Sequence, residues 1–526
     1  MMSTVADLLL ARSSDTETAL LFDNQRVTWA DHVLMSRRWA AWVDSMLDDA
    51  SPPHVGVLLD NVPEFSYLLG AAALGGFVLV GLNATRTGAA LTDDASRTHC
   101  QLILTDSRRL GDIEGAFDIA TVELAEPFDL SGTAARADDL LALVFTSGTS
   151  GDPKAVRCTH DKIAGPGKML ASRFELGPAD TVYVSMPLFH SNAIMAGWSV
   201  ALASGANLAL RATFSASNFI SDVRRFGATY ANYVGTPLSY ILATPPRHDD
   251  RDNPLRVVYG NEATPGAAAV FADRFAVRVV DGFGSSEGGI SIARTPDTPA
   301  GALGPIPDGV DILDPSGTSC AVARFDPGGA LVNDGEAVGE LVNTAGPGMF
   351  CGYYDDDAAD ADRMRGGMYF SGDLAYRDAD GYVYFAGRST GWLRVGGENL
   401  TAAPIERILL RHPEIHAVSV YGVPATGPGD RVMAAVVAPE HIMDELPSFL
   451  ADQPDLGVRA RPELVRVCTD LPRTATHKVL ARELQRQRWN TADPVFRSAD
   501  GCGRFERLSE RDRRDLDNSV DTARAR

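Results

Sequence analysis

A run of small and hydroxylated residues follows an apolar stretch and ends in a lysine. After Leu-Leu-Ala-Leu-Val-Phe come Thr146, Ser147, Gly148, Thr149, Ser150, Gly151, Asp152, Pro153 and Lys154. Backbone N–H groups of such a loop can turn toward an anion, and the lysine adds a positive charge. The common pattern GxxxxGK[ST] is absent, which disfavours a kinase or GTPase. On these residues alone, a phosphate-binding loop and a polar hairpin stay equally open.

Other side chains capable of chemistry lie in separate segments. His190 lies in PLFHSNA, Glu287 in GFGSSEGG, Asp373 in YFSGDLAYRD and Lys478 in PRTATHK. Each has an ordinary interpretation: a hydrogen-bonded structural histidine, a solvated carboxylate, a turn-forming aspartate and a solvated lysine. None of them identifies a site without the elements that would bring it to the others.

Short apolar runs separated by helix-length segments predict those elements. The runs are residues 55–59, 102–105, 141–147, 182–188, 255–260 and 277–284. Continuous apolar strands that alternate with helices indicate parallel sheets covered on both faces. The fold class is therefore α/β. From about residue 301 to 384 the turn signals DPSG, DPGG, NDGE and DADG predict a β-rich subdomain.

The chain is expected to have three parts. Residues 1–388 form a large N-terminal domain, and residues 389–490 form a small α+β domain. In the small domain an amphipathic helix is expected over 402–415, with strands after it. Residues 491–526 are rich in charged side chains and are expected to be a polar, frayed tail.

Composition limits the partners and the location. The 526 residues include 48 Lys and Arg and 69 Asp and Glu, so the net charge of −21 argues against binding to nucleic acid. The longest uncharged apolar stretch, residues 67–82, is too short to cross a bilayer and predicts a buried helix followed by a strand. Six cysteines without a CxxC pair suit a reducing cytosol. We expect a cytoplasmic monomer or homodimer with at most peripheral membrane contact.

Five segments, taken in order, resemble the signatures of the adenylate-forming superfamily, the AMP-dependent synthetases and ligases. They are LVFTSGTSGDPKAV, PLFHSNA, GFGSSEGG, YFSGDLAYRDADGYVYFAGR and LPRTATHKVL. The segments GWLRVGGENL and LPRTATHKVLARELQRQRW resemble the branch of fatty-acid-transport proteins and very-long-chain acyl-CoA synthetases. The resemblance implies the adenylate-forming fold, in which the C-terminal domain, here 389–490, is mobile.

The resemblance also implies a two-step reaction that uses ATP, Mg²⁺ and CoA. A fatty-acid carboxylate attacks the α-phosphate to give acyl-AMP and pyrophosphate, and the CoA thiol then displaces AMP. The expected function is ligation of a long-chain fatty acid to CoA. Three alternatives stay open: a fatty acyl-AMP ligase without the CoA step, a ligase for a sterol or aryl acid, and a non-enzymatic lipid-binding or uptake protein.

By the same resemblance, four residues are catalytic. Lys478 bridges the substrate carboxylate and the phosphate ester, Glu287 binds Mg²⁺ with help from Thr146, and His190 lies next to the substrate. Lys154 and the loop 146–151 hold the β- and γ-phosphates. Further contacts to ATP or AMP are expected from Gly260, Asn261, Glu262, Phe283, Gly284, Ser285, Ser286, Asp373 and Arg388. The acyl pocket is expected to include His190, Ala193, Trp198, Val234 and Gly235, and CoA is expected to pass Gly396 and Gly397.

The sequence departs from the pattern of the superfamily at three places. Phe283 stands where a tyrosine is usual, and Ser286 where a threonine is usual. After Arg388 the hinge reads Ser389-Thr390-Gly391, without the usual acidic residue. Whether this hinge slows the CoA step, and which acid is activated, are left open by the sequence.

Overall fold

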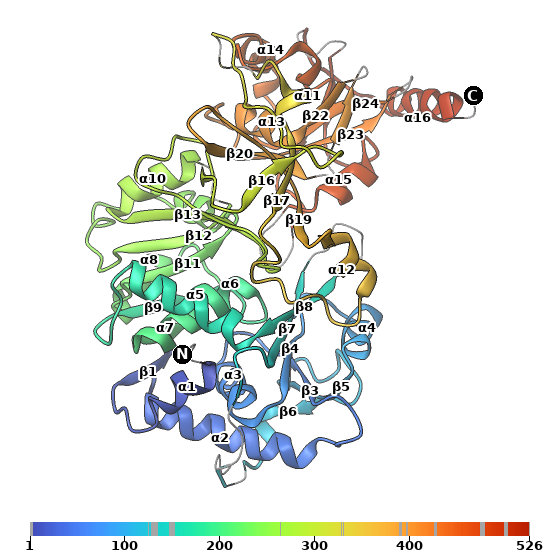
Figure 1. Cartoon of the computed structure of the whole chain (residues 1–526). Helices are drawn as coiled ribbons and strands as arrows, with labels where there is room; N and C mark the ends of the chain where they lie inside the picture. The colour runs from blue at the N-terminus through green and yellow to red at the C-terminus, as the bar shows by residue number, and fades with distance from the viewer. Residues whose placement is uncertain are drawn as a thin grey trace. The chain divides into compact units, whose positions relative to one another are not determined.

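The computed structural model describes residues 4–124, 126–127, 135–146, 153–262, 265–327, 329, 331–388, 392–395, 398–425, 429–473, 479–498 and 503–524. The chain forms two compact units (Figure 1). The first unit contains residues 1–291 and 347–364, and the second contains 292–346 and 365–526. The segment 347–364 therefore returns to the first unit after the chain has entered the second.

One six-stranded sheet of the first unit carries the predicted loop. Its order is β6 (Phe117–Asp118), β5 (Cys100–Thr105), β3 (His54–Leu58), β4 (Val78–Gly81), β7 (Leu140–Thr146) and β8 (Lys154–Thr159). Neighbours pair in parallel except β7 and β8, which form an antiparallel hairpin. Val55, Val57 and Leu143 are fully buried in it. Continuous apolar strands thus lie in a largely parallel sheet, as the sequence predicted.

The other sheet of the first unit has eight strands. Their order is β14 (Ser291–Ala293), β13 (Arg278–Gly284), β12 (Val257–Asn261), β11 (Tyr230–Val234), β9 (Thr181–Val184), β10 (Asn207–Leu210), β1 (Thr18–Phe22) and β2 (Gln25–Thr28). The strands from β13 to β1 run parallel. Parallel strands end at one edge, so residues that follow β11, β12 and β13 are brought together.

Helices between these strands complete the first unit. They are α1 (Val5–Leu10), α2 (Trp29–Met46), α3 (Pro63–Gly75), α4 (Ala89–Arg97), α5 (His160–Arg173), α6 (Ser191–Ala193), α7 (Ser199–Ser204), α8 (Phe219–Phe226), α9 (Pro237–Leu242), α10 (Pro265–Phe275) and α12 (Asp357–Arg363), with η1 (Ile119–Thr121) and a π-helical turn η2 (Ile194–Trp198). In α8, Phe219, Val223 and Phe226 recur at helical spacing and pack in one core cluster with Phe271.

The apolar stretch 67–82 is a buried helix followed by a strand, as predicted. Pro63 begins α3, and Gly76 ends it in the left-handed conformation at φ 77°. Every residue from Pro63 to Leu74 except Glu64 is buried, and β4 is buried throughout. Among the described residues, no helix has the length and apolar character needed to cross a bilayer.

The second unit begins with the predicted β-rich part. Its sheet runs β15 (Gly304–Pro305), β20 (Tyr382–Arg388), β19 (Met368–Arg377), β17 (Gly339–Asn343) and β16 (Val310–Leu313), with β18 (Met364–Arg365) paired to β19. A short helix, α11 (Asp334–Ala337), precedes β17. All the pairs in this sheet for which a register is given are antiparallel.

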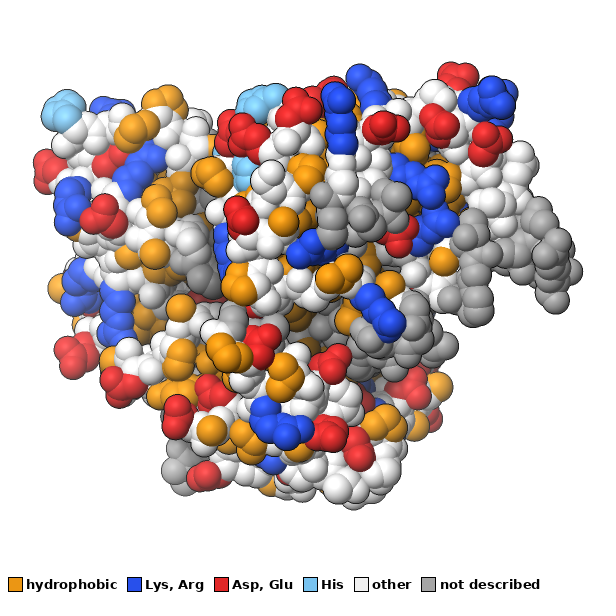
Figure 2. All heavy atoms as spheres, turned by 90° about the horizontal axis from the view of Figure 1, so that it is seen from above, with side chains coloured by type: hydrophobic (Ala, Val, Ile, Leu, Met, Phe, Trp, Pro, Cys, Tyr) orange, Lys and Arg blue, Asp and Glu red, His pale blue; other side chains and the backbone are white. Residues whose placement is uncertain are grey.

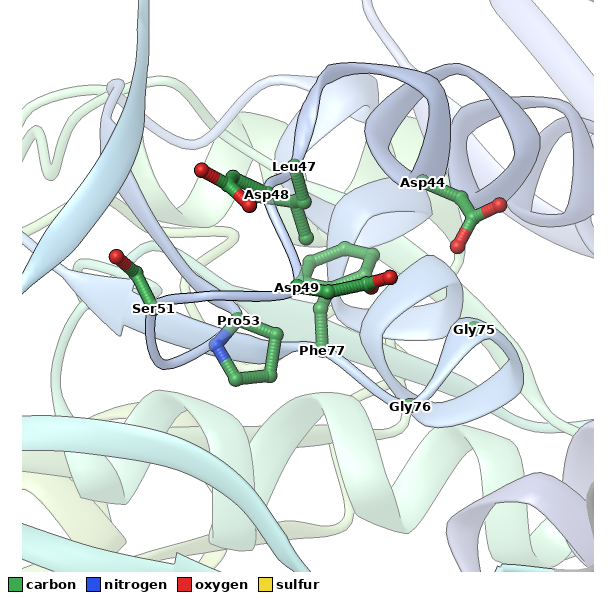
Figure 3. A pocket seen from close by; sticks show the side chains of 9 residues that line it. All are labelled: Asp44, Leu47, Asp48, Asp49, Ser51, Pro53, Gly75, Gly76 and Phe77. Atoms are coloured by element: carbon green, nitrogen blue, oxygen red, sulfur yellow. The ribbon is translucent and has the colours of Figure 1, made fainter.

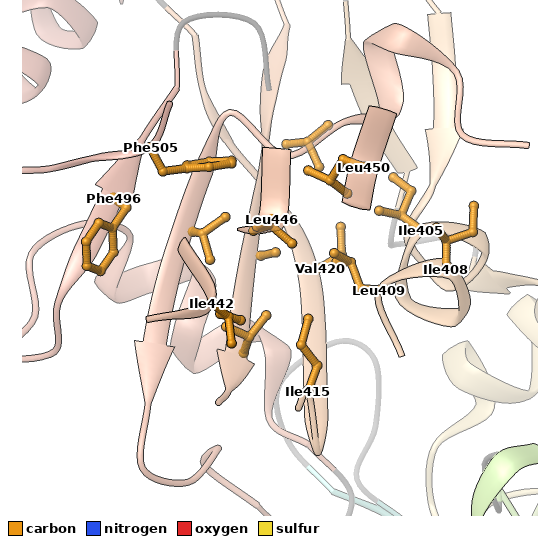
Figure 4. Close-up of a cluster of buried hydrophobic side chains, with 14 of the residues drawn as sticks. Ile405, Ile408, Leu409, Ile415, Val420, Ile442, Leu446, Leu450, Phe496 and Phe505 are labelled. Atoms are coloured by element: carbon orange, nitrogen blue, oxygen red, sulfur yellow. The ribbon is translucent and has the colours of Figure 1, made fainter. Parts of the chain in front are cut away.

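The remainder of the second unit is α+β. A hairpin, β21 (Trp392–Val395) and β22 (Glu398–Thr401), leads to the helices α13 (Ala402–Leu409), α14 (Ile442–Ala451), η3 (Val458–Ala460) and α15 (Ala481–Gln487). The sheet beside them runs β23 (Ala417–Pro424), β24 (Asp430–Val437), β25 (Leu464–Cys468), β26 (Val495–Arg497) and β27 (Glu506–Arg507). Ile405, Ile408, Val420 and Leu446 fill the core between α13, α14 and this sheet (Figure 4).

The tail after residue 490 differs from the expected frayed extension. It adds β26 and β27 to the sheet and ends in α16 (Glu510–Arg524). Leu516 and Val520, four residues apart on α16, are buried in a core cluster with Trp489. The Trp489 indole donates to Asp517 Oδ1 at 3.0 Å. The high charge of this segment concealed the apolar residues that pack it against the rest of the unit.

The surface carries charges of both signs. On the face drawn in Figure 2, acidic and basic side chains are interspersed, and hydrophobic ones occur in small groups. The five cysteines within the described ranges, Cys100, Cys158, Cys320, Cys351 and Cys468, are free thiols.

Candidate active site

The hairpin between β7 and β8 brings the ends of the predicted phosphate loop together. Thr146 ends β7, Lys154 begins β8, and the two are cross-strand partners. Both residues are half-buried, so the Thr146 hydroxyl and the Lys154 ammonium group are not enclosed in the core. Ser147, Gly148, Thr149, Ser150 and Gly151 lie outside the described residues. Their contacts to phosphate stay a prediction.

The carboxyl ends of β11, β12 and β13 form the second part of the site. Val234, Asn261 and Gly282 are partners across the three strands. The Asn261 amide donates to the Gly282 carbonyl at 2.6 Å, which ties two of these ends together. At Gly260 a Cβ would lie 2.2 Å from the Tyr233 carbonyl oxygen, so only glycine fits there. Glu262, which follows, has φ 68°, and the half-buried Phe283 and the exposed Gly284 end β13.

The segment after His190 is hydrogen-bonded to this edge. Ser191 Oγ lies 2.6 Å from Ser286 Oγ. The Asn192 amide donates to Asn261 Oδ1 at 3.4 Å and accepts from the buried Asn232 at 2.6 Å. The half-buried His190 precedes α6 and donates its backbone N–H to Pro187. Sequence reasoning missed Asn192 and Asn232, because their partners come from distant strands.

Glu287 is one of the buried carboxylates of the first unit, with 8% of its surface exposed. The Tyr353 hydroxyl donates to Glu287 Oε1 at 3.0 Å, and Arg363 Nε donates to the same hydroxyl at 3.3 Å. The buried Lys162 ammonium donates to the Glu287 carbonyl at 2.8 Å. Burial alone would raise the pKa of Glu287, but the charge of Arg363 and hydrogen bonds from the backbone, Ser285 and Tyr353 lower it. Glu287 is therefore ionised at neutral pH.

The groups around Glu287 fit a hard divalent cation whose other ligands come from phosphate and water. Within the described ranges no cluster of three or more His, Cys, Asp or Glu side chains could hold a metal ion. An ionised carboxylate is what Mg²⁺ accepts when phosphate and water supply its other oxygens. A closed structural site for zinc does not fit these residues.

The predicted acyl-pocket residues are packed in the core beside η2. Ala193, Trp198 and Val234 are buried, and Gly235 has φ 71°. The Trp198 indole donates to Ser66 Oγ at 2.8 Å. His32 Nε2 lies 2.8 Å from the same oxygen, and burial lowers the pKa of His32 to about 4. The orientation of Trp198 is thus fixed by α2 and α3, which sequence reasoning had not connected to it.

Asp373 and Arg388 are neighbours in the second unit. They are cross-strand partners on β19 and β20, and Arg388 Nε lies 3.4 Å from Asp373 Oδ1. The Asp373 backbone N–H donates to Ser371 Oγ at 3.0 Å, next to Gly372 at φ 74°. The described residues do not include Gly396, Gly397, Lys478 or the hinge 389–391, so the predicted roles of these residues stay predictions.

A separate cavity of about 230 Å³ lies at the ends of α2 and α3. Asp44, Asp48 and Asp49 line it together with Gly76 and Phe77 (Figure 3). Three carboxylates would repel an anionic ligand. None of the predicted site residues lines this cavity.

Comparison with known families gives two matches. Residues 10–354 match the model described as AMP-binding enzyme, and residues 404–478 match the AMP-binding enzyme C-terminal domain.

Similarity to individual proteins extends these matches. The chain is 52% identical to a medium/long-chain-fatty-acid–CoA ligase of Mycobacterium marinum, over 94% of this chain and 98% of that protein. It is 45% identical to a steroid-22-oyl-CoA synthetase of Rhodococcus jostii, over 94% and 93%. It is 30% identical to human long-chain fatty acid transport protein 1, over 68% and 59%. The structure of ATP-bound MatB from Rhodopseudomonas palustris is similar at a TM-score of 0.78, with 22% identity over 92% of this chain and 99% of that one.

Proposed function

The chain belongs to the AMP-binding enzyme family, and on this premise we propose that it joins a medium- or long-chain fatty acid to CoA, using ATP. The observation that carries the proposal is the 52% identity to a fatty-acid–CoA ligase across almost the full length of both chains. The resemblance to the adenylate-forming superfamily and the α/β fold class are confirmed. So is the relation to fatty acid transport proteins, at a greater distance.

In the first step the residues of the first unit would bring together two anions, the fatty-acid carboxylate and ATP. We assign the β- and γ-phosphates to Lys154 and the loop that begins at Thr146, because an ammonium group and hydroxyls offset their charge. Glu287, kept ionised by its surroundings, would hold Mg²⁺. When bound, this ion neutralises phosphate oxygens. His190, hydrogen-bonded through its backbone at the start of α6, would orient the carboxylate.

We assign the nucleoside contacts from the resemblance, residue by residue. At the carboxyl ends of β12 and β13, Asn261 and the ring of Phe283 offer an amide and a flat apolar face to adenine. In the second unit, Asp373 is an acceptor-only group that suits two ribose hydroxyls, and Arg388 beside it suits the phosphate side. Gly260, Glu262, Gly284, Ser285 and Ser286 complete the proposed nucleotide contacts.

The second step would deliver the CoA thiol to acyl-AMP. We assign Gly396 and Gly397 to the passage of the thiol arm, and Lys478 to the carboxylate and phosphate ester during adenylation. A division into residues 1–388 and a mobile domain of residues 389–490 is part of this proposal, as are a monomeric or dimeric state and a cytoplasmic location with at most peripheral membrane contact.

A steroid side-chain acid is the second candidate substrate. The chain is 45% identical to a steroid-22-oyl-CoA synthetase over 94% of its length. If the substrate is not a fatty acid, this similarity favours a bulky acid that carries rings. Ala193, Trp198, Val234 and Gly235 are the wall that would distinguish the two acids.

The test is release of AMP and pyrophosphate from ATP and Mg²⁺ with a panel of medium-chain, long-chain and steroid side-chain acids, with and without CoA. We expect AMP release that depends on CoA, with thioester formed and a fatty acid preferred. Thioester formation with the steroid acid alone would favour the second candidate. Accumulation of acyl-AMP in the presence of CoA would indicate an acyl-AMP ligase, and an absence of turnover with every acid would contradict the proposal.

A further inference from the structure

The segment 347–364 runs antiparallel to β8. Tyr353 forms a β-bridge with Val156, the Arg157 N–H donates to the Gly352 carbonyl at 3.1 Å, and the Tyr354 N–H donates to the Ala155 carbonyl at 2.8 Å. Because β8 begins at Lys154, this pairing fixes Tyr353 beside the strand that carries the lysine. The segment thus brings a hydroxyl to the candidate phosphate site from a part of the sequence that contributes no other predicted residue.

Tyr353 contacts both an anion and a cation of the site. Its hydroxyl lies between Glu287 Oε1 at 3.0 Å and Arg363 Nε at 3.3 Å. A guanidinium group can only donate, so the single hydroxyl proton is directed to the carboxylate. The ammonium group of Lys154 lies 5.1 Å from the centroid of the same ring, within the range of a cation–π contact.

This arrangement separates two groups that would otherwise attract each other. A buried carboxylate without a fixed donor pairs with a nearby cation. Two lysines contact its neighbours, since Lys154 lies over the Tyr353 ring and Lys162 donates to the Glu287 backbone carbonyl. Lys162 is already bonded to the carbonyls of Glu287 and Arg157. The rigid ring of Tyr353 holds the carboxylate at its hydroxyl end and the ammonium group of Lys154 at its face. The carboxylate then stays available to a metal ion and the ammonium group to phosphate.

We propose that Tyr353, oriented by Arg363, is a positioning residue that fixes the Glu287 carboxylate for a divalent cation and keeps Lys154 apart for the nucleotide phosphates. The inference rests on the proposed function, since it requires that Glu287 holds a metal ion together with ATP. It assigns to the segment 347–364 a part in the adenylation site.

The test is calorimetric binding of ATP to the full chain, with Mg²⁺ and with a chelator, in the absence of any carboxylic acid so that no reaction follows. Tyr353→Phe keeps the ring, its packing on Phe350 and the contact to Lys154, and removes the hydroxyl alone. We expect the Mg²⁺-dependent gain in ATP affinity to fall about 10- to 100-fold, while binding without the metal ion is unchanged.

Tyr354→Phe is the matched control, because the Tyr354 hydroxyl lies 3.0 Å from His99 Nδ1 and not at the site. We expect it to bind ATP as the unaltered chain does. Arg363→Lys keeps the charge but not the Nε bond to the hydroxyl, so it should shift the same gain in the same direction and by less. It also provides a second measurement if Tyr353→Phe fails to fold.

Three results distinguish the proposed role of Tyr353 from the proposed role of Glu287. A loss of the Mg²⁺-dependent gain in Tyr353→Phe alone of the two tyrosine variants supports the inference. An unchanged gain in Tyr353→Phe overturns the inference and leaves the proposed function standing. A lack of any Mg²⁺-dependent gain in the unaltered chain overturns the proposed role of Glu287, and the inference with it.

Discussion

Glu287 and Asp373, the candidate carboxylates of the two units, are equally buried but are held by different kinds of contact. Each has 8% of its surface exposed. Glu287 is held by Tyr353, Arg363 and Lys162, which are 66 or more residues away along the chain. Asp373 faces Arg388 on the next strand, and its backbone N–H donates to Ser371 Oγ within its own turn. The first carboxylate depends on the assembly of its whole unit, and the second on one local hairpin.

The largest expected effect is that of Glu287→Gln. The amide has nearly the same shape but no charge, so the proposed metal ion would lose a ligand and Arg363 would lose its counter-charge. We expect the rate of ATP–pyrophosphate exchange to fall about 10²- to 10³-fold, mainly in kcat. Thioester formation from supplied acyl-AMP is the control and should continue. An equal loss in both half-reactions would contradict the assignment.

Asp373→Asn tests the other side of the comparison and should have a smaller effect. Asparagine keeps one acceptor oxygen on the same strand, so ribose binding weakens without loss of the step itself. We expect the KM for ATP to rise about 10-fold with a modest change in kcat, measured by the same exchange assay. Asp311→Asn is the control, because Asp311 pairs with Arg377 on the same sheet but is not a predicted site residue. A larger fall in kcat than for Glu287→Gln would reverse the comparison.

The two units should also respond oppositely to pH, first through His32. Burial lowers the pKa of His32 to about 4 from an ordinary 6.5. Between these two pH values His32 binds a proton in the unfolded chain but not in the folded unit. Stability is therefore lost as the pH falls from 6.5 toward 4. The loss amounts to about 3 kcal/mol of unfolding free energy. Hydrogen exchange of α2 and α3 against pH would show it, and a flat profile would contradict it.

Glu406 should give the second unit the opposite dependence of stability on pH, by an effect of similar size. Burial raises the pKa of Glu406 from an ordinary 4.5 to about 7, although the Val420 N–H donates to its carboxyl at 2.8 Å. The folded unit then binds a proton that the unfolded chain has released, so stability is lost as the pH rises from 4.5 through 7. We expect a loss of about 3 kcal/mol of unfolding free energy, which the substitution Glu406→Gln should remove. Hydrogen exchange of α13 and β23 against pH would measure it.

The same difference between local and long-range assembly explains what sequence reasoning found. Asp373 and Arg388 could be expected together because apolar residues and the turn DADG define two adjacent strands. Strands with continuous apolar runs were also predictable, although β9 ends at Val184 and not at residue 188, since Met186 and Leu188 are buried beyond the strand and Pro187 between them cannot donate.

Tyr353 and Arg363 could not be expected at the site from spacing. They lie between two β-rich blocks, and only the return of the segment 347–364 to the first unit brings them to Glu287. Composition likewise concealed Leu516 and Val520 on α16, because two apolar residues among charged ones do not change the average of a segment. Wherever a contact joins residues far apart, periodicity predicts the element but not the partner.

The return of residues 347–364 also determines when the first unit can mature during synthesis. A nascent chain that has reached Ser291 contains Glu287 and the strands of both sheets of this unit up to β13, but neither Tyr353 nor Arg363. Between Glu287 and Arg363 the ribosome adds 76 residues, which takes about 4–15 s at ordinary elongation rates. During that interval the carboxylate lacks its designated donor, and the first part of the second unit emerges before the first unit is closed. The two units are thus interleaved in translation, because residues 292–346 of the second unit are synthesised before the last segment of the first.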